Sequence, residues 1–395
     1  MAAMKFRSGL LAAAMSTVMA TTSACALLPG ESSDPSVQQP TVSAASEQTS
    51  TSSPKTDTCP IHTELDSMEV RTKIAQLLTV GVASAEDAMW AVNDINVGGI
   101  FIGSDVAEPI LASGQLPELR RQAPFPLMVT IDEEGGRVSR MDAVSGPLPS
   151  ARAMAQMPIE EVRNLARMRG EEMKRLGITV DFAPTIDVSA QPDDDVIGDR
   201  SFSPDPQVVI DYARAFAEGL LEAGITPVFK HFPGHGRSTG DSHQSAVSVP
   251  PIEELRDYEL RPFAQLVGMP RTAVMMGHLD APGITAPGEP ASMSPGAYDL
   301  LRSGEGYGGP PYNGVIFTDD LSGMRAITDH YTVPEAVLQS LIAGADSPLW
   351  ISTAELVPTI DIIEQAVNDG RYPVERLDAS VQRMSELRSS NGCNE

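Results

Sequence analysis

From residue 60 onward, short apolar runs alternate with segments that carry an amphipathic helical pattern. Apolar runs of roughly four to eight residues between turn signals are typical of strands buried on both faces. Eight segments fit this description: 77–80, 99–102, 127–131, 179–182, 226–229, 273–276, 315–318 and a weaker one within 343–349. Helical patterns lie between several of them, which predicts βα units and a parallel sheet.

Two helical segments carry a clear apolar stripe, and residues at such spacing face the core of a globular protein. One stripe consists of Val208, Tyr212, Phe216 and Leu220, and Gly224 follows as a stop signal. The other consists of Ile159, Val162, Leu165, Met173 and Leu176. Eight strands joined by helices suggest an α/β fold of the (β/α)8 barrel type, although the first and eighth strands give weak signals.

The N-terminus has a different pattern. Lys5 and Arg7 precede an apolar stretch at 10–20, and small residues follow up to Cys25, as in an export signal. Residues 22–25 resemble a bacterial lipobox, with Thr22 where leucine is usual. We therefore expect residues 1–25 to be a signal peptide and Cys25 to carry a lipid. The alternative is a plain secretory signal cut near the same place.

Residues 26–58 are rich in Ser, Thr, Pro, Gln and Glu and offer little to bury, so we expect a disordered tether. The folded domain then spans 59–395. Of the three cysteines, Cys59 and Cys393 stand at the two ends of this domain. In an exported protein such a pair is usually a disulfide, and domain termini are often close in space. Two free thiols are the alternative.

Composition narrows the possible partners. The formal net charge of −25 disfavours nucleic acid and anionic membrane surfaces, which would repel the chain. Beyond the N-terminus there is no apolar run of about 18 residues or more, so no internal membrane span is expected. We expect an exported protein, either held at the outer face of the cell membrane through a lipid anchor or secreted.

The densest chemistry follows the apolar run at 225–229. Residues 230–236 read Lys-His-Phe-Pro-Gly-His-Gly, and residues 241–243 read Asp-Ser-His. Three of the six histidines of the chain lie in these fourteen positions. Polar groups at the point where a buried strand gives way to a Gly/Pro-rich loop are typical of an α/β active site. This stretch therefore predicts a site.

The same stretch resembles the signature loop of glycoside hydrolase family 3, in its β-N-acetylglucosaminidase branch. Three further segments agree in order: Ile-Asp-Glu-Glu-Gly-Gly-Arg-Val at 131–138, Gly-Asp-Arg-Ser-Phe at 198–202 and Phe-Thr-Asp-Asp-Leu-Ser at 317–322. Glu133 stands where glutamine is common in this branch. The resemblance covers roughly residues 70–390 and implies a single-domain barrel that needs no cofactor.

A barrel places chemistry after its strands, on one face. Asp132 follows the third expected strand, Lys230 and His231 the fifth, His278 the sixth and Asp319 the seventh. Four separate segments of the chain thus converge on one rim.

The pair Asp319 and Asp320 ends the seventh strand. Side chains alternate along a strand, so one carboxylate can enter the barrel mouth while the other caps the surrounding loop. A retaining β-glycosidase needs a carboxylate nucleophile. Periodicity does not decide between the two aspartates, and the family resemblance implies Asp319.

The resemblance also implies that His243 is the general acid/base and that Asp241 supports it. An imidazole titrates near neutrality and can donate and then accept a proton, while a neighbouring carboxylate orients the ring. Sugar contacts are implied at Asp132, Arg140, Arg200, Lys230 and His231. A structural salt-bridge network around the rim is the alternative, and Arg137 could be confused with Arg140.

We expect a retaining β-N-acetylglucosaminidase, acting as a monomer on small carbohydrates, namely cell-wall fragments with terminal GlcNAc linked to MurNAc. Phosphorolysis is also chemically open, because a histidine does not repel an incoming phosphate as a carboxylate would. A metal-dependent hydrolase using His231, His235, Asp241 and His243 is a further possibility, although Pro233 and Gly234 break the helix that such a ligand pair needs. An exported sugar-binding lipoprotein is the last alternative.

Overall fold

The computed structural model describes residues 67–241 and 244–390. The predicted signal peptide, tether and lipid-bearing Cys25 lie outside the described residues. So do the predicted pair Cys59 and Cys393 and the predicted acid/base His243.

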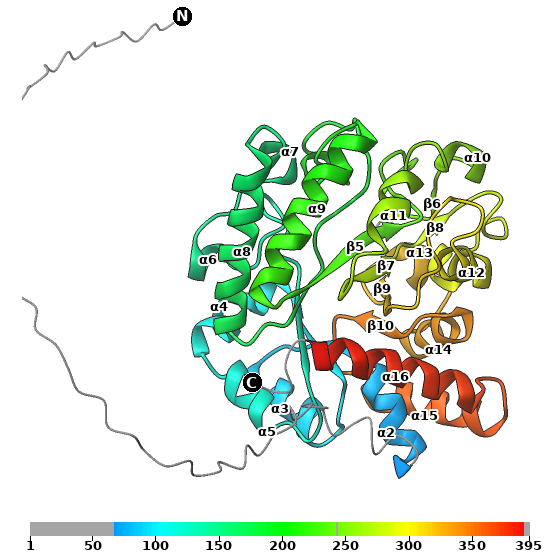
Figure 1. Cartoon of the computed structure of the whole chain (residues 1–395). Coiled ribbons are helices and arrows are strands. Elements are labelled where there is room, and N and C mark those ends of the chain that lie inside the picture. The colour runs from blue at the N-terminus through cyan, green and yellow to red at the C-terminus, as the bar shows by residue number, and fades with distance from the viewer. Residues whose placement is uncertain (1–66, 242–243, 391–395) are drawn as a thin grey trace, which may run out of the picture. The chain divides into compact units, whose positions relative to one another are not determined.

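Eight parallel strands close into a barrel surrounded by helices (Figure 1), which confirms the predicted (β/α)8 fold. In space the strands run in the order β1-β10-β9-β7-β5-β4-β3-β2 and each pairs in parallel with its neighbours. Their bounds are β1 Thr79–Gly81, β2 Gly99–Ile102, β3 Met128–Ile131, β4 Val180–Asp181, β5 Thr226–Phe232, β7 Ala273–Met276, β9 Ile316–Asp320 and β10 Ser347–Trp350.

The strands found at 99–102 and 273–276 have the predicted bounds, whereas the first and last strands are shifted along the chain. Leu77 belongs to helix α2, so the apolar residues before Thr79 are the buried end of a helix. At the other end of the chain, α14 runs to Ala343 and Gly344 follows it, so β10 begins only at Ser347. In both cases the buried end of a helix precedes the strand and adds its own apolar residues to the run, so the strand was expected to begin too early.

The longer helices are α2 Val70–Leu77, α3 Ala85–Asn93, α4 Ser104–Ser113, α8 Ile159–Arg175, α9 Pro206–Ala223, α12 Pro295–Ser303, α14 Val333–Ala343, α15 Leu356–Asn368 and α16 Val374–Ser390. Shorter helices are α5 Leu116–Gln122, α6 Asp142–Ser145, α7 Ala151–Met154, α10 Ile252–Leu255, α11 Leu260–Leu266 and α13 Arg325–Thr328. A small parallel pair, β6 Val247–Ser248 with β8 Leu279–Asp280, stands outside the barrel and is absent from the sequence prediction.

Helix α9 begins where Asp205 accepts a hydrogen bond from the Gln207 N–H, and it ends at Gly224, whose φ of 86° suits glycine. Phe216 and Leu220 of the predicted stripe are buried, whereas Val208 and Tyr212 are only partly buried. The backbones of α8 and α9 approach closely, since a Cβ on Gly219 would lie 2.2 Å from the Arg163 carbonyl oxygen.

In α8, Val162 and Met173 are buried as predicted, and Leu165 and Leu176 are partly buried. The prediction that Ile159 faces the core is wrong, because its exposed fraction is 40%. Ile159 is the first residue of α8. The amphipathic pattern therefore includes one residue, Ile159, that lies beyond the part of α8 that packs against the core.

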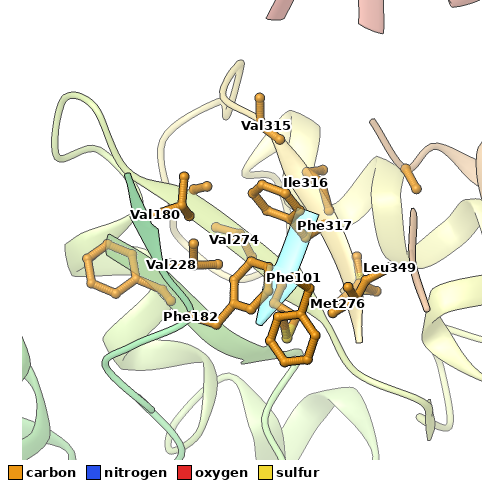
Figure 2. Close-up of a cluster of buried hydrophobic side chains, with 14 of the residues drawn as sticks. Phe101, Val180, Phe182, Val228, Val274, Met276, Val315, Ile316, Phe317 and Leu349 are labelled. Carbon is orange, nitrogen blue, oxygen red and sulfur yellow. The ribbon is translucent and has the colours of Figure 1, made fainter. Parts of the chain in front are cut away.

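Three aromatic rings lie within a cluster of buried hydrophobic side chains contributed by the barrel strands (Figure 2). Phe101 of β2 stacks on Phe182 at a centroid distance of 5.8 Å, and Phe182 meets Phe317 of β9 edge-on at 5.2 Å. Such pairs add stability beyond the area that they bury. Because Phe317 faces these rings, Asp319, two residues further along β9, points to the same side of the sheet.

No helix among residues 67–241 and 244–390 is both long enough and apolar enough to cross a membrane.

Candidate active site

A pocket of about 590 Å³ opens at the carboxyl ends of the barrel strands. Every sugar-contact residue predicted from the sequence lines it, together with the predicted nucleophile: Asp132, Arg140, Arg200, Lys230, His231 and Asp319. These residues come from four separate parts of the chain, at the ends of β3, β4, β5 and β9, so the structure brings together what the sequence placed at one rim. Segments after β1, β2, β9 and β10 complete the wall with Val82, with Val106 of α4, and with Met324 and Ile351.

Lys230 lies at the centre of a chain of ion pairs in this pocket. Its Nζ is 2.7 Å from Oδ1 of Asp132 and 2.6 Å from Oε1 of Glu134. Arg200 donates to both carboxylate oxygens of Glu134, each at 2.8 Å. This two-pronged contact fixes the plane of the guanidinium as well as its position.

The groups in this chain of ion pairs keep one another ionised although they are buried. Burial raises the pKa of the Glu134 carboxyl, but Arg200 and Lys230 outweigh burial and hold that pKa well below its usual range. Burial likewise lowers the pKa of the Lys230 ammonium, but Asp132 and Glu134 outweigh it and raise that pKa. The pocket therefore presents fixed, fully charged donors and acceptors at neutral pH.

Two arginines follow Asp132 and Glu134, and they point to different places. The NH2 group of Arg140 lies 3.7 Å from Oδ2 of Asp132, and Arg140 lines the pocket. Arg137 instead donates to Asp199 at 2.9 Å and to the carbonyl oxygen of Ile197 at 3.1 Å. The geometry thus places Arg140 at the pocket and Arg137 in the loop that carries Arg200.

His231 is oriented by Asp187, a carboxylate with no exposed surface. Oδ2 of Asp187 lies 2.7 Å from Nδ1 of His231, and its Oδ1 accepts the backbone N–H of His235 at 2.7 Å. Burial raises the pKa of Asp187, but the charge and hydrogen bond of His231 outweigh burial and lower it. An ionised Asp187 accepts the Nδ1 proton, so Nε2 of His231 faces the pocket.

His235 belongs to the architecture of the loop. Its ring packs edge-on against His231 at a centroid distance of 5.7 Å and is almost completely buried. Burial, with the nearby charge of His231, lowers the pKa of His235 to about 4. The ring is therefore neutral at physiological pH. The next residue, Gly236, has no room for a side chain, since a Cβ there would lie 1.9 Å from the Val188 carbonyl oxygen.

Asp319 lies at the base of the pocket. Its Oδ2 is 3.9 Å from Nε2 of His231, and its Oδ1 accepts the Asp320 N–H at 2.9 Å. Burial raises the pKa of the Asp319 carboxyl, but His231, His278 and Lys230 outweigh burial and lower the pKa below its usual value. The carboxylate is therefore ionised, and few donors compete for its oxygens.

Asp320 uses its carboxylate differently. It accepts the N–H of Ser322 at 2.8 Å, the hydroxyl of Ser322 at 2.7 Å and the N–H of Gly323 at 2.8 Å. Its carbonyl oxygen meets Nε2 of His278 at 2.9 Å. Asp320 thus caps the loop after β9, in line with the expectation that the two neighbouring aspartates divide these tasks.

Asp241 stands on the loop between β5 and β6 and is not among the pocket-lining residues. Its Oδ2 accepts the side-chain amide of Gln244 at 3.1 Å. The base of this loop is fixed by Arg237, which donates to the buried Glu259 at 2.8 Å, and by Thr239, whose N–H donates to the Ser248 carbonyl at 2.9 Å. Its proposed partner His243 falls between the two described ranges.

Sequence reasoning missed two carboxylates that organise the site, Glu134 and Asp187. Glu134 stands two residues after Asp132, next to the strand end that the sequence placed at the rim, a signal that could have identified it. Asp187 lies in the loop after β4, and its contact with His231 spans 44 residues of sequence. Within residues 67–241 and 244–390, no cluster of His, Cys, Asp and Glu has an arrangement suited to a metal ion.

Taken together, an ionised carboxylate at the base of the pocket is surrounded by charged groups in fixed positions. Such donors and acceptors match the hydroxyl groups of a sugar, and the carboxylate can attack or stabilise a cationic anomeric carbon.

The sequence is similar to those of known proteins. Residues 69–387 match the glycosyl hydrolase family 3 N-terminal domain. The chain is 50% identical over 326 residues to Beta-hexosaminidase LpqI of Mycobacterium tuberculosis, which covers 82% of this chain and 84% of that protein. It is 33% identical over 282 residues to a Beta-hexosaminidase of Xylella fastidiosa, covering 68% of this chain and 82% of that protein.

Solved structures agree. A family 3 glycosyl hydrolase from Mycobacterium smegmatis superposes with a TM-score of 0.80 at 50% identity, covering 82% of this chain and 98% of that one. A family 3 beta-N-acetylglucosaminidase from Paenibacillus sp. superposes with a TM-score of 0.75 at 30% identity, covering 83% and 64%. With its barrel, its pocket and these relatives, the chain belongs to glycosyl hydrolase family 3 and is a glycoside hydrolase.

Proposed function

We propose that the protein is a retaining β-N-acetylglucosaminidase that releases terminal GlcNAc from β-linked substrates. The observation that carries the proposal is the state of Asp319, an ionised carboxylate at the base of the pocket, 3.9 Å from His231. A retaining glycosidase needs such a group within reach of the anomeric carbon. Asp320, the neighbouring carboxylate, is already occupied by Ser322 and Gly323.

In the proposed mechanism, an oxygen of Asp319 attacks the anomeric carbon and the bond to the leaving oxygen breaks. His243 donates the proton that this oxygen takes up, and Asp241 stabilises the ring. Water then attacks the glycosyl-enzyme and gives its proton to His243, which restores Asp319 as a carboxylate. Each proton step of this kind is worth roughly 10²–10⁴ in rate. No metal ion or organic cofactor takes part in these steps.

The sugar is held by the groups that already fix one another. Asp132 offers an acceptor beside the Lys230 ammonium and the Arg140 guanidinium. Arg200 supplies donors from another segment, and Nε2 of His231 faces the pocket. Because the ion pairs are formed before substrate arrives, little ordering is needed when the sugar binds.

The acetamido preference and the cell-wall substrate rest on relatives and on sequence. The M. tuberculosis and X. fastidiosa relatives are named beta-hexosaminidases, and the Paenibacillus structure is titled a beta-N-acetylglucosaminidase. The export pattern of residues 1–25 would bring this enzyme to the cell envelope, where GlcNAc–MurNAc fragments occur. We therefore propose peptidoglycan fragments as the substrate.

We also propose that the mature protein is anchored through Cys25 and closed by a bridge between Cys59 and Cys393. Thiol counting on the denatured, unreduced mature protein should then detect no reactive cysteine. Two reactive thiols would exclude the bridge. An unmodified N-terminus on protein released into the medium would exclude the anchor.

Turnover of an aryl β-N-acetylglucosaminide against the matching aryl β-glucoside tests the central proposal. The acetamido sugar should be cleaved with the higher kcat/KM, and the GlcNAc first released should keep the β configuration. Inverted product would exclude a covalent glycosyl-enzyme on Asp319. Adding phosphate decides the acceptor: appearance of GlcNAc 1-phosphate in place of GlcNAc would make the enzyme a phosphorylase.

A further inference from the structure

A second cavity, of about 350 Å³, lies at the other end of the barrel. Helices α12, α14 and α16 contribute most of its lining: Tyr298, Asp299, Arg302, Leu341, Ala343, Arg376, Ala379, Ser380 and Arg383. Beside it, Asp346 precedes β10 and accepts the N–H of Ile316, the first residue of β9, at 2.9 Å. Because Asp319 stands near the opposite end of β9, this cavity and the catalytic pocket lie at opposite ends of the strands.

Three arginines line this cavity in a protein with 28 basic and 53 acidic residues. The buried Asp346 neutralises part of their charge. It accepts from Arg302, from Arg383 at 2.8 Å and from the hydroxyl of Ser380 at 2.8 Å. Asp346 itself lies beside the cavity, and the one acidic residue among those that line it is Asp299, which is exposed. Three positive charges thus meet two negative ones, and one of these two is open to solvent.

The arginines differ in what they leave available. Arg302 is held on several sides, because it also donates to the carbonyl oxygen of Gly314 at 2.6 Å. Arg376 and Arg383 stand seven residues apart on α16, which places them on one face of the helix. Arg376 donates through NH1 to the Ile342 carbonyl at 2.8 Å, and Arg383 donates through NH1 to Asp346. Each of these two hydrogen bonds uses NH1 of its guanidinium. Among the contacts of residues 67–241 and 244–390, NH2 of Arg376 and NH2 of Arg383 therefore remain available for a ligand.

We propose that this cavity binds a small anion of the phosphate class, either free phosphate or a small phosphomonoester. The remaining donors of Arg376 and Arg383 suit two oxygens of one phosphate group, as guanidinium forks do. Arg376 lies in the first turn of the 17-residue helix α16, whose N-terminal end also favours negative charge. The cavity is at the small end of the range for ligand sites, so the occupant is small.

This site is distinct from the catalytic pocket and does not depend on the proposed glycosidase activity. The buried side chains of Tyr298 and Tyr372 contribute an aromatic part of the cavity wall. Its most direct consequence is stabilisation of the barrel end, because an anion that binds only the folded protein raises its stability in proportion to occupancy.

Isothermal titration of the full mature protein with inorganic phosphate and with glycerol phosphate tests the site, at constant ionic strength set with sodium chloride. Arg376→Gln should weaken binding by about tenfold or more, the effect of losing one charge-assisted contact. Arg371→Gln is the matched control, since Arg371 is half-exposed, lies just before α16 and pairs only weakly with Asp369 at 3.8 Å. It should bind like the wild type, and Arg376→Lys should keep part of the affinity.

The Arg140→Gln variant distinguishes phosphate binding at this site from phosphate binding in the catalytic pocket, which also contains cationic side chains. Binding that survives Arg140→Gln and falls in Arg376→Gln supports the proposal. Binding lost in Arg140→Gln alone, equal binding by Arg376→Gln and the wild type, or no heat with either probe would overturn it. Tighter binding of glycerol phosphate than of phosphate would identify a phosphomonoester as the occupant, and equal binding would identify free phosphate.

Discussion

Nδ1 of His231 lies 2.7 Å from Oδ2 of Asp187, and both residues are buried. This contact determines which ring nitrogen faces Asp319, because the ionised Asp187 holds a proton on Nδ1. The same carboxylate accepts the N–H of His235 at 2.7 Å. Asp187 thus orients the loop of residues 230–236 as well as the ring, although it lies outside every motif that the sequence offered.

Replacing Asp187 by Asn should therefore impair the site without unfolding the protein. The amide can donate to Nδ1 where the carboxylate accepts from it, so His231 can take the other tautomer, with its lone pair on Nδ1 and its proton on Nε2. We expect kcat on an aryl β-N-acetylglucosaminide to fall at least about tenfold, as happens when orienting groups of catalytic histidines are changed. Steady-state kinetics with Asp199→Asn as a rim control will measure this. Unchanged kcat in Asp187→Asn would mean that His231 does not need the contact.

Asp319→Ala should abolish turnover while the fold persists. As the proposed nucleophile, Asp319 should contribute more than a single stabilising donor, so kcat should fall by more than about 10³-fold. Asp320→Ala provides the comparison, since it removes the contacts to Ser322 and Gly323 and should act mainly on the thermal midpoint. If Asp320→Ala were inactive and Asp319→Ala active, the nucleophile would be Asp320 and not Asp319.

The sequence is most informative where local pattern and barrel geometry act together. Asp132, Lys230 and Asp319 could be placed at one rim because each follows an apolar strand, and the rim rule needs no long-range contact. Asp187 could not, because its role depends on a partner 44 residues away. Ile159 was misplaced because the first residue of α8 continues the apolar pattern beyond the buried surface. The basic cavity gave no signal, since Arg302 comes from α12 whereas Arg376 and Arg383 come from α16, more than 70 residues later in the sequence.

Glu134→Gln tests the ion-pair chain that sequence reasoning missed. The carboxylate is almost fully buried between Lys230 and Arg200, so its loss leaves two buried cations with too little negative charge. Breaking such a network costs about 3–5 kcal/mol of unfolding free energy. The free energy of unfolding in urea is the measurement. Glu118→Gln, which removes a surface pair with Arg121, should change stability by less than about 1 kcal/mol.

The lowered pKa of His235 predicts that the protein loses part of its folding stability in acid. Its folded pKa of about 4 lies below the unfolded value of about 6.5, so the unfolded chain binds this proton more tightly. The stabilising contribution is complete above about pH 6.5 and disappears as the pH falls towards 4. Unfolding free energies of the wild type and of His235→Gln should therefore converge over this window. A constant difference between pH 7 and pH 4 would show that His235 does not titrate there.

The proton donor can be identified by measuring how the rate of each variant depends on the leaving group of the substrate. If His243 is the acid and Asp241 supports it, His243→Ala should slow substrates with poor leaving groups by roughly 10²–10⁴-fold and spare activated aryl glycosides, which depart without a proton. Asp241→Ala should show the same selectivity more mildly, because the imidazole remains. Ser238→Ala, a change at an exposed position on the same loop, serves as the control and should behave like the wild type.

Azide offers a second readout for the same residue. A small anionic nucleophile attacks the glycosyl-enzyme without general-base help, so it should restore turnover of activated substrates in His243→Ala and release a β-glycosyl azide. The wild type should gain little from azide, because its own base already activates water. A uniform loss across good and poor leaving groups, with no azide rescue, would mean that His243 positions substrate. The acid would then be another group lining the pocket, and Asp320 would be the first to test, because burial raises the pKa of its carboxyl.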